Sequence, residues 1–191
     1  IRLQKRVDYN AFAILYRTNA QSRILEEACR KQNIPYRVFG SISFYQRKEI
    51  KDALAYFRLS VNLNDDESIR RVINYPTRGI GKTTLEKLSM SAFEAGVSLW
   101  SVLNDPESFS SKFNKGTLSK LAGFKTVISH FHKRQSGEEA FDLGQDILTK
   151  TSILQEFAYD RTPESLSKYE NLQELLNGIR EFAEDEKKHN P

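Results

Sequence analysis

The sequence has very little cysteine and no long hydrophobic run. Its 191 residues include one cysteine, Cys29, so an internal disulfide framework is excluded and a reducing compartment is expected. Cys29 falls on an amphipathic helical pattern, and we interpret it as a packing residue. No apolar run approaches the ~20 residues that a membrane-spanning helix needs. We therefore expect no membrane partner.

Motifs for nucleotide hydrolysis and metal binding are also missing. Gly81-Lys82-Thr83 is similar to the end of a phosphate-binding loop, but Pro76 stands where that motif requires its first glycine. His130, His132 and His189 have no Cys or acidic partner at metal-ligand spacing. The sequence therefore predicts no catalytic residue and no metal site in this chain.

The composition is that of a folded protein whose charge is unevenly distributed. Hydrophobic residues make up 39% of the chain, with 12 Phe and 8 Tyr, so we expect a real core. Residues 1–58 hold 12 Lys and Arg against 5 Asp and Glu, whereas residues 59–191 hold 17 against 20. A basic first part favours a polyanionic partner. The alternative is an ordinary solvated surface.

The first 40 residues have the pattern of a short β-α-β unit. The apolar run 11–16 predicts a strand buried on both faces. Residues 19–32 predict a helix with Asn19 as its N-cap, and residues 36–39 predict a second strand. Such a unit is typical of RecA-like or Rossmann-like sheets, but it is too short to be a complete α/β domain. Because the sequence begins at Ile1 and soon reaches a strand, we expect an internal piece of a longer protein.

The rest of the chain predicts helices only. Apolar residues recur at helical spacing from residue 47 to 61, and a short helix should begin near 65–68 and end before Tyr75-Pro76. Further helices are expected from Leu85 to near Gly96 and over 98–103, 116–134, 138–150 and 164–188. The predicted fold class is therefore mainly α: a helical domain of about 140 residues preceded by a short β-α-β piece.

The strongest local signal is a glycine turn that precedes a helix. It comprises Thr77, Arg78, Gly79, Ile80, Gly81, Lys82, Thr83 and Thr84, and it is similar to one helix-hairpin-helix element. Glycines let a backbone approach a ligand closely, and the N–H groups of the next helix favour phosphate. We therefore expect this turn to contact the DNA backbone rather than the bases. The alternative is a ligand-free helix–helix turn in which Ile80 plugs into the core.

Two further segments combine polar, basic and aromatic residues. Tyr16, Arg17, Asn19, Gln21, Ser22 and Arg23 follow the first predicted strand, at the end of a sheet where ligands bind. They could face phosphate, nucleic acid or a neighbouring domain, or only cap the helix and carry surface charge. Phe44, Tyr45, Arg47 and Lys48 could stack bases and contact phosphates. Alternatively, the two aromatic residues fasten the loop to the core.

These three segments, in this order, resemble the UvrD/PcrA/Rep group of superfamily 1 DNA helicases. Residues 16–23 resemble helicase motif IV, residues 44–52 followed by 55–59 resemble the next block, and residues 74–81 resemble the duplex-contacting motif of the accessory 2B domain. The resemblance is strong over 9–95 and diffuse over 96–191. Gly40-Ser41 departs from the more usual Gly-Gly, and Gln46 replaces an acidic residue.

The resemblance implies a parent enzyme that uses ATP and Mg²⁺ to move 3′ to 5′ on single-stranded DNA. Residues 1–45 would belong to its second RecA-like domain, and residues 46–191 to a 2B-like domain truncated at its C-terminus. The chain alone should be inactive as an ATPase and bind neither cofactor. Expected partners are duplex DNA and its junction with single strands, and repair or replication proteins. We expect a monomeric piece of a cytoplasmic, nucleoid-associated bacterial protein. The alternative function is a protein-interaction module with little DNA affinity.

Overall fold

The computed structural model describes residues 7–109 and 113–189, with side chains to residue 187. The ends of the two predicted domains, residues 1–6 and 190–191, lie outside the described residues. Within them the chain is mainly helical, which confirms the predicted class. The α-helices are α2 (Ser22–Lys31), α3 (Lys48–Val61), α4 (Asp66–Val72), α5 (Lys82–Ala95), α6 (Leu99–Asn104), α7 (Lys115–Arg134), α8 (Ala140–Lys150), α9 (Ile153–Tyr159) and α10 (Pro163–His189). Three short 3-10 turns, η1 (Tyr9–Ala11), η2 (Asn19–Gln21) and η3 (Phe44–Gln46), precede α2 and α3.

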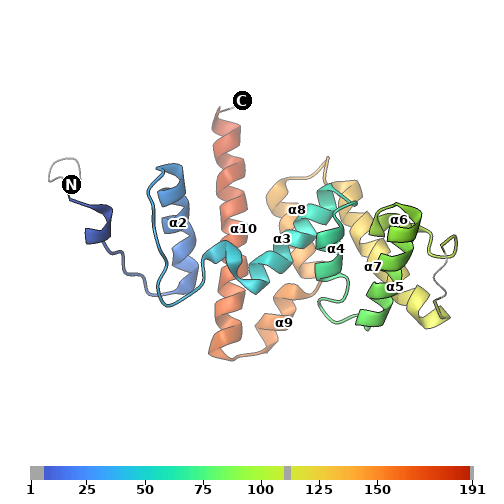
Figure 1. The fold of residues 1–191 in the computed structure, drawn as a ribbon. Coiled ribbons are helices and arrows are strands. Elements are labelled where there is room, and N and C mark those ends of the chain that lie inside the picture. The colour runs from blue at the N-terminus through green and yellow to red at the C-terminus, as the bar shows by residue number, and fades with distance from the viewer. Residues whose placement is uncertain (1–6, 110–112, 190–191) are drawn as a thin grey trace.

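The long helix α10 stands between α2 and the other helices (Figure 1). On one side it contacts η2, and on the other it packs against α3, α8 and α9. Helix α3 runs through the middle of the bundle, where it contacts α4, α7, α8 and α10. The helices α5 and α6 pack together at the end of the bundle far from α2 (Figure 1).

The apolar core belongs to the helices from η3 onward. Its buried members run from Phe44 to Leu176 and include Ile50, Tyr56 and Phe124, all fully buried. Helix α2 contributes none of them, because its buried residues are Ser22, Arg23 and Glu26. The helix α2 is therefore held by polar contacts rather than by hydrophobic packing.

Local sequence signals explain where the helices begin and end. Asp65 caps α4 by accepting the Ser68 N–H at 3.0 Å, and Asn114 caps α7 by accepting the Thr117 N–H at 2.8 Å. Gly96 ends α5 in the left-handed conformation, with φ of +65°, which glycine adopts without steric cost. Helix α9 was missed by the sequence interpretation, because seven residues between polar turns carry too little periodicity.

The two predicted strands are not formed in the described part of the chain. Residues 12–16 and 34–39 belong to no helix or turn, and they pair with no neighbouring strand there. A strand is stable only when a neighbour satisfies its backbone hydrogen bonds. The apolar run is also open to solvent, and Leu15 is 94% exposed. The β-α-β prediction is therefore not confirmed by this structure. No described helix is long and apolar enough to cross a bilayer.

Candidate nucleic-acid interface and its supporting network

The glycine turn connects α4 to α5 and is held from within by Asn74. The Asn74 Oδ1 accepts the backbone N–H groups of Arg78 at 3.0 Å and Ile80 at 2.9 Å. Ile80 is only 2% exposed and lies in the core, as the alternative interpretation of this turn expected. Gly79 has φ of +70°, so a side chain there would be strained. Gly81 has an ordinary φ of −76° and serves as the N-cap of α5.

Arg78 points into the protein, which corrects its expected role as a phosphate contact. Its Nη1 donates to the carbonyl oxygens of Val72 at 3.1 Å, Tyr75 at 2.8 Å and Pro76 at 3.2 Å. The guanidinium also lies 5.7 Å from the Tyr56 ring centroid and 5.6 Å from that of Phe124. Arg78 therefore fastens the turn, because its Nη1 bonds the carbonyl groups of Val72, Tyr75 and Pro76, the first two of which also accept the Tyr56 hydroxyl.

The outer face of the turn is open to solvent. Thr77, Gly79, Gly81 and Thr83 are exposed, and Thr84 is half-buried. Lys82 is 89% exposed, with its Nζ 3.6 Å from Glu86, a separation at which an exposed pair is weak. Intrahelical bonding leaves the first N–H groups of a helix free, and these point outward with the positive end of its dipole. The structure thus presents Lys82 and Thr83 of the predicted site, while it turns Arg78 and Ile80 inward.

Residues 16–23 mainly form the N-terminal end of helix α2 and the 3-10 turn η2 before it. The Gln21 Oε1 accepts the backbone N–H groups of Arg17 at 2.9 Å and Thr18 at 3.1 Å. Thr18, rather than the predicted Asn19, is the residue that precedes the helical turns. Tyr16 is half-buried, and Arg17, Asn19 and Gln21 are exposed, so the exposed members remain open to a partner.

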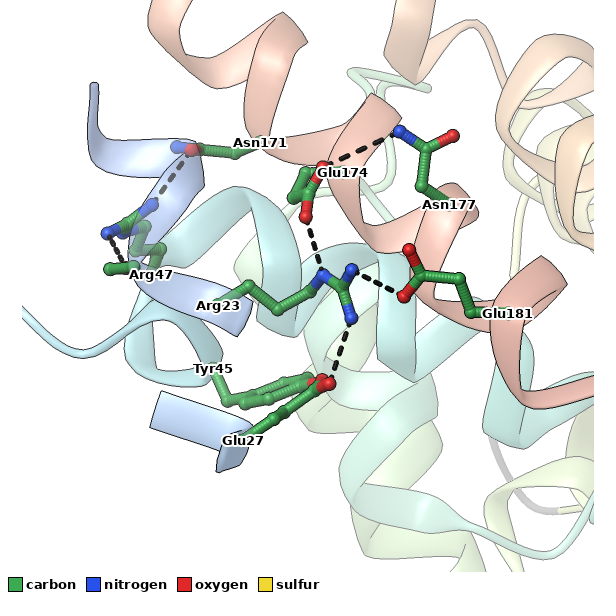
Figure 2. A network of polar contacts seen from close by, with 9 residues as sticks. Arg23, Glu27, Tyr45, Arg47, Asn171, Glu174, Asn177 and Glu181 are labelled. Atoms are coloured by element: carbon green, nitrogen blue, oxygen red, sulfur yellow. Dashed lines mark hydrogen bonds and ion pairs between the residues drawn. The ribbon is translucent and has the colours of Figure 1, made fainter. Parts of the chain in front are cut away.

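Arg23 is buried between α2 and α10 and neutralised by three carboxylates (Figure 2). Its guanidinium nitrogens lie 2.9 Å from Glu27, 2.8 Å from Glu174 and 2.9 Å from Glu181, and its side chain is 1% exposed. Burial alone would lower the pKa of Arg23, but its bonds to Glu181 and Glu174 raise it above its usual value. Gly178 makes room for this contact, since a Cβ there would lie 2.8 Å from the Arg23 Nη1.

A second buried arginine, Arg47, also links α2 to α10 (Figure 2). Its Nη2 donates to the Ser22 hydroxyl at 2.9 Å, and its Nη1 donates to the Asn171 Oδ1 at 2.8 Å. The Asn171 amide in turn donates to Glu49 at 2.7 Å. Ser22, Arg23 and Arg47 therefore join α2 to α10 and are closed to DNA. Arg23 and Arg47, which the sequence suggested as ligand contacts, thus contact other parts of the chain instead.

The aromatic pair of the third segment fastens the loop to the helices. Phe44 is fully buried in the core. The Tyr45 hydroxyl donates to Glu27 at 2.5 Å, and burial raises the pKa of Tyr45 to about 12. Lys48 stays exposed, with its Nζ 2.9 Å from Asp52 and 4.1 Å from the Tyr75 ring centroid. The packing interpretation therefore holds for Phe44, and only Lys48 of this group remains available to an anion.

Glu26 of α2 holds the loop before α3 through hydrogen bonds that depend on pH. Its carboxylate accepts the Phe44 N–H at 2.9 Å, the Tyr36 hydroxyl at 3.1 Å and the Ser43 hydroxyl. Burial alone would raise the pKa of Glu26, but hydrogen bonds from Ser43 and Phe44 lower it below 4.5. The stability from this group is therefore present above about pH 4.5 and is lost as the pH falls through the folded-state pKa.

We expect Glu26→Gln to lower the free energy of unfolding by about 2 kcal/mol at neutral pH, because hydrogen bonds to a charged acceptor are replaced by weaker ones. The difference from the parent chain should be smaller at acidic pH than at neutral pH, because the parent carboxylate becomes protonated as the pH falls through its lowered pKa. Urea unfolding at both pH values measures this, with the exposed Glu107→Gln as control. A deficit of equal size at both pH values would contradict the assignment.

The described residues contain no group of three His, Cys, Asp or Glu side chains that could hold a metal ion. The His132 Nδ1 lies 2.9 Å from the Ser60 carbonyl oxygen, and the His130 Nε2 lies 3.0 Å from both Arg134 and Lys150. The sequence also lacks the glycine-lysine loop that binds a triphosphate.

Sequence reasoning missed one residue at the turn. Lys120, in the second turn of α7, donates from its Nζ to the Gly79 carbonyl oxygen at 3.1 Å. The two residues are 41 positions apart, and no local pattern signals the contact. Only the packing of α7 brings this ammonium group to the turn.

Comparison with known proteins identifies the family of this chain. A family model described as the UvrD-like helicase C-terminal domain matches residues 1–191. The protein named ATP-dependent DNA helicase PcrA from Staphylococcus epidermidis strain RP62A is 37% identical over 177 residues, which cover 93% of this chain and 24% of that protein. Its namesake from Staphylococcus aureus strain Mu50 is 36% identical over the same share of each chain. The chain thus spans about a quarter of the length of these curated relatives, and it belongs to the UvrD-like helicase C-terminal domain family.

Proposed function

We propose that this chain is the part of an ATP-dependent 3′–5′ DNA helicase that binds the backbone of duplex DNA next to the fork and regulates unwinding. Residues 46–191 would form most of a 2B-like accessory domain, and residues 1–45 would belong to the second RecA-like domain. Two observations support this boundary. The apolar core begins at Phe44, next to this boundary, and the buried residues of α2, which precedes it, are all polar or charged.

The observation that carries the proposal is the construction of the turn at 77–84. Its inner side is anchored by Ile80, Asn74 and Arg78, so the backbone on the outer side is held in one conformation. That outer side presents Lys82, Thr83 and the first turn of α5 to solvent. A rigid backbone with a cation is suited to phosphate. Such contacts position a duplex without reading its sequence.

ATP and Mg²⁺ would act in the motor of the parent enzyme. The curated relatives are named ATP-dependent helicases, whereas this chain lacks the motif that holds nucleotide phosphates. We therefore propose that the chain alone is inactive as an ATPase. The parent would be a cytoplasmic bacterial protein.

Lys82→Ala tests the duplex contact. We expect the variant to bind a blunt duplex severalfold more weakly at low salt, and the slope of log K against log salt to become shallower by about 0.9, because one fewer counterion is released. Its free energy of unfolding should not change, since Lys82 is exposed. Fluorescence anisotropy between about 50 and 200 mM salt measures the slope.

Lys133→Ala is the matched control for this experiment. It removes the same charge from an exposed position in the last turn of α7, 13 residues beyond Lys120 and therefore roughly 20 Å further along that helix. Its affinity and slope should match those of the parent chain. Equal behaviour of Lys82→Ala and Lys133→Ala would show that the turn does not bind the duplex.

The alternative function, a protein-interaction module, is favoured by one observation. Met90 and Phe93, one helical turn apart on α5, are both strongly exposed, and Phe93 is 87% exposed. Large exposed apolar side chains are common in protein interfaces. Binding to a partner protein that survives high salt, without measurable duplex affinity, would favour this function over DNA binding.

A further inference from the structure

Lys120 reaches the glycine turn from a different helix. Its Nζ lies 3.1 Å from the Gly79 carbonyl oxygen, and a Cβ placed on Gly79 would lie 2.7 Å from the same Nζ. The ammonium group therefore sits directly against the glycine backbone, in the space that any side chain at residue 79 would take. Both Lys120 and Gly79 are exposed, so the group lies on the outer side of the turn.

The charge of Lys120 is the least compensated of the cations around the turn. The Arg78 guanidinium points inward onto three carbonyl groups, and Lys82 has Glu86 nearby. Among the described residues, no carboxylate lies within ion-pair distance of Lys120. An ammonium group has three N–H donors, of which the Gly79 carbonyl takes one. Two donors and a full positive charge are thus left for an acceptor from outside.

We propose that Lys120 contacts a DNA phosphate next to the one bound by Lys82. It takes the role that the sequence suggested for Arg78. This inference rests on the proposed duplex-binding function. Lys82 on α5 and Lys120 on α7 supply the charge from two helices, and the contact with Gly79 holds Lys120 in place. The ligand is a phosphodiester of duplex DNA. A single exposed lysine has little affinity for free phosphate, whereas a duplex supplies further contacts along its backbone.

The test compares Lys120→Gln with Lys125→Gln in the full chain. Lys125 is on the same helix and also donates from its Nζ to a carbonyl oxygen, that of Asn104, at 3.1 Å, so the control loses the same charge and the same kind of bond away from the turn. We expect Lys120→Gln to weaken blunt-duplex binding severalfold and to make the salt slope shallower by about 0.9. Lys120→Arg should restore the slope. Lys125→Gln should behave as the parent chain.

The outcomes separate this inference from the proposed function. A shallower slope for both Lys82→Ala and Lys120→Gln supports both. A change for Lys82→Ala alone overturns the role of Lys120 and leaves the duplex function standing, while a change for neither overturns both. If Lys120→Gln alters only the melting temperature, the contact with Gly79 is structural and the inference fails. Inorganic phosphate that competes with the duplex more strongly than chloride at the same ionic strength would indicate a free-anion site and overturn the duplex assignment.

Discussion

Replacing Arg23 with Met is expected to release α2 from α10 while the helical core stays folded. The variant leaves Glu27, Glu174 and Glu181 without their shared cation. Removing one partner of a buried ion pair costs about 3–5 kcal/mol, and we expect a value near 3 kcal/mol because these carboxylates are partly exposed and can be rehydrated. Since α2 contributes no residue to the apolar core, the loss should be local.

Hydrogen exchange measures this local loss directly. A decrease of about 3 kcal/mol in the opening free energy corresponds to roughly 100-fold faster exchange. We expect that change in the amides of α2, residues 22–31, whereas the amides of α3, residues 48–61, should keep their protection. Unchanged exchange in α2 would show that the three carboxylates do not hold it.

Two further variants separate the arginine network from general effects of lost charge. Arg134→Met also removes an arginine paired with carboxylates, Glu138 and Asp146, but at the surface, so it should leave α2 unaffected. Gly178→Ala keeps every charge and places a methyl group 2.8 Å from the Arg23 Nη1. It should also increase hydrogen exchange in α2, because the methyl group displaces the guanidinium from its position against α10.

Arg78→Ala is expected to destabilise the whole helical domain rather than only to weaken DNA binding. Hydrogen bonds from a charged donor contribute about 1.5–3 kcal/mol, and the lost guanidinium also packs beside Tyr56 and Phe124. The Tyr56 hydroxyl still donates to the carbonyl oxygens of Val72 and Tyr75, which limits the expected cost to about 2 kcal/mol. Urea unfolding measures the change.

Arg78→Lys distinguishes a structural arginine from a phosphate contact. A lysine keeps the charge, but its ammonium group cannot reproduce the planar guanidinium that lies among three carbonyl groups and two rings. We therefore expect Arg78→Lys to be destabilised nearly as much as Arg78→Ala. If Arg78→Lys is fully stable, and only Arg78→Ala changes the slope of duplex affinity against salt, then Arg78 contacts DNA phosphate after all.

The helices were largely predictable because their signals are local. Apolar residues at helical spacing indicated α3 and α5, and Gly96 marked the end of α5 with the positive φ that the structure shows. The predicted helix 116–134 differs from α7 by one residue at its start. Caps and periodicity act within a few residues, so a single sequence contains them.

The strands were not predictable in the same way. The runs 11–16 and 36–39 have strand composition, but a strand forms only when another segment completes its hydrogen bonds. The described residues supply no such partner. Composition therefore indicated a strand, but without a neighbouring strand among the described residues these segments form none and stay largely exposed.

The sequence by itself determined the helical class, the position of the glycine turn and the motifs of the helicase family, because each depends on residue types at short, regular spacing. Only the tertiary structure decided which basic residues point inward and which stay open to solvent. Arg23 and Arg47 are turned inward by Glu174 and Asn171 of the distant helix α10, and Lys120 is carried to Gly79 by the packing of α7, whereas Arg78 is held by carbonyl groups two to six residues away. The direction in which a long charged side chain points depends on where its partners lie in three dimensions, and no local pattern of residues contains that information.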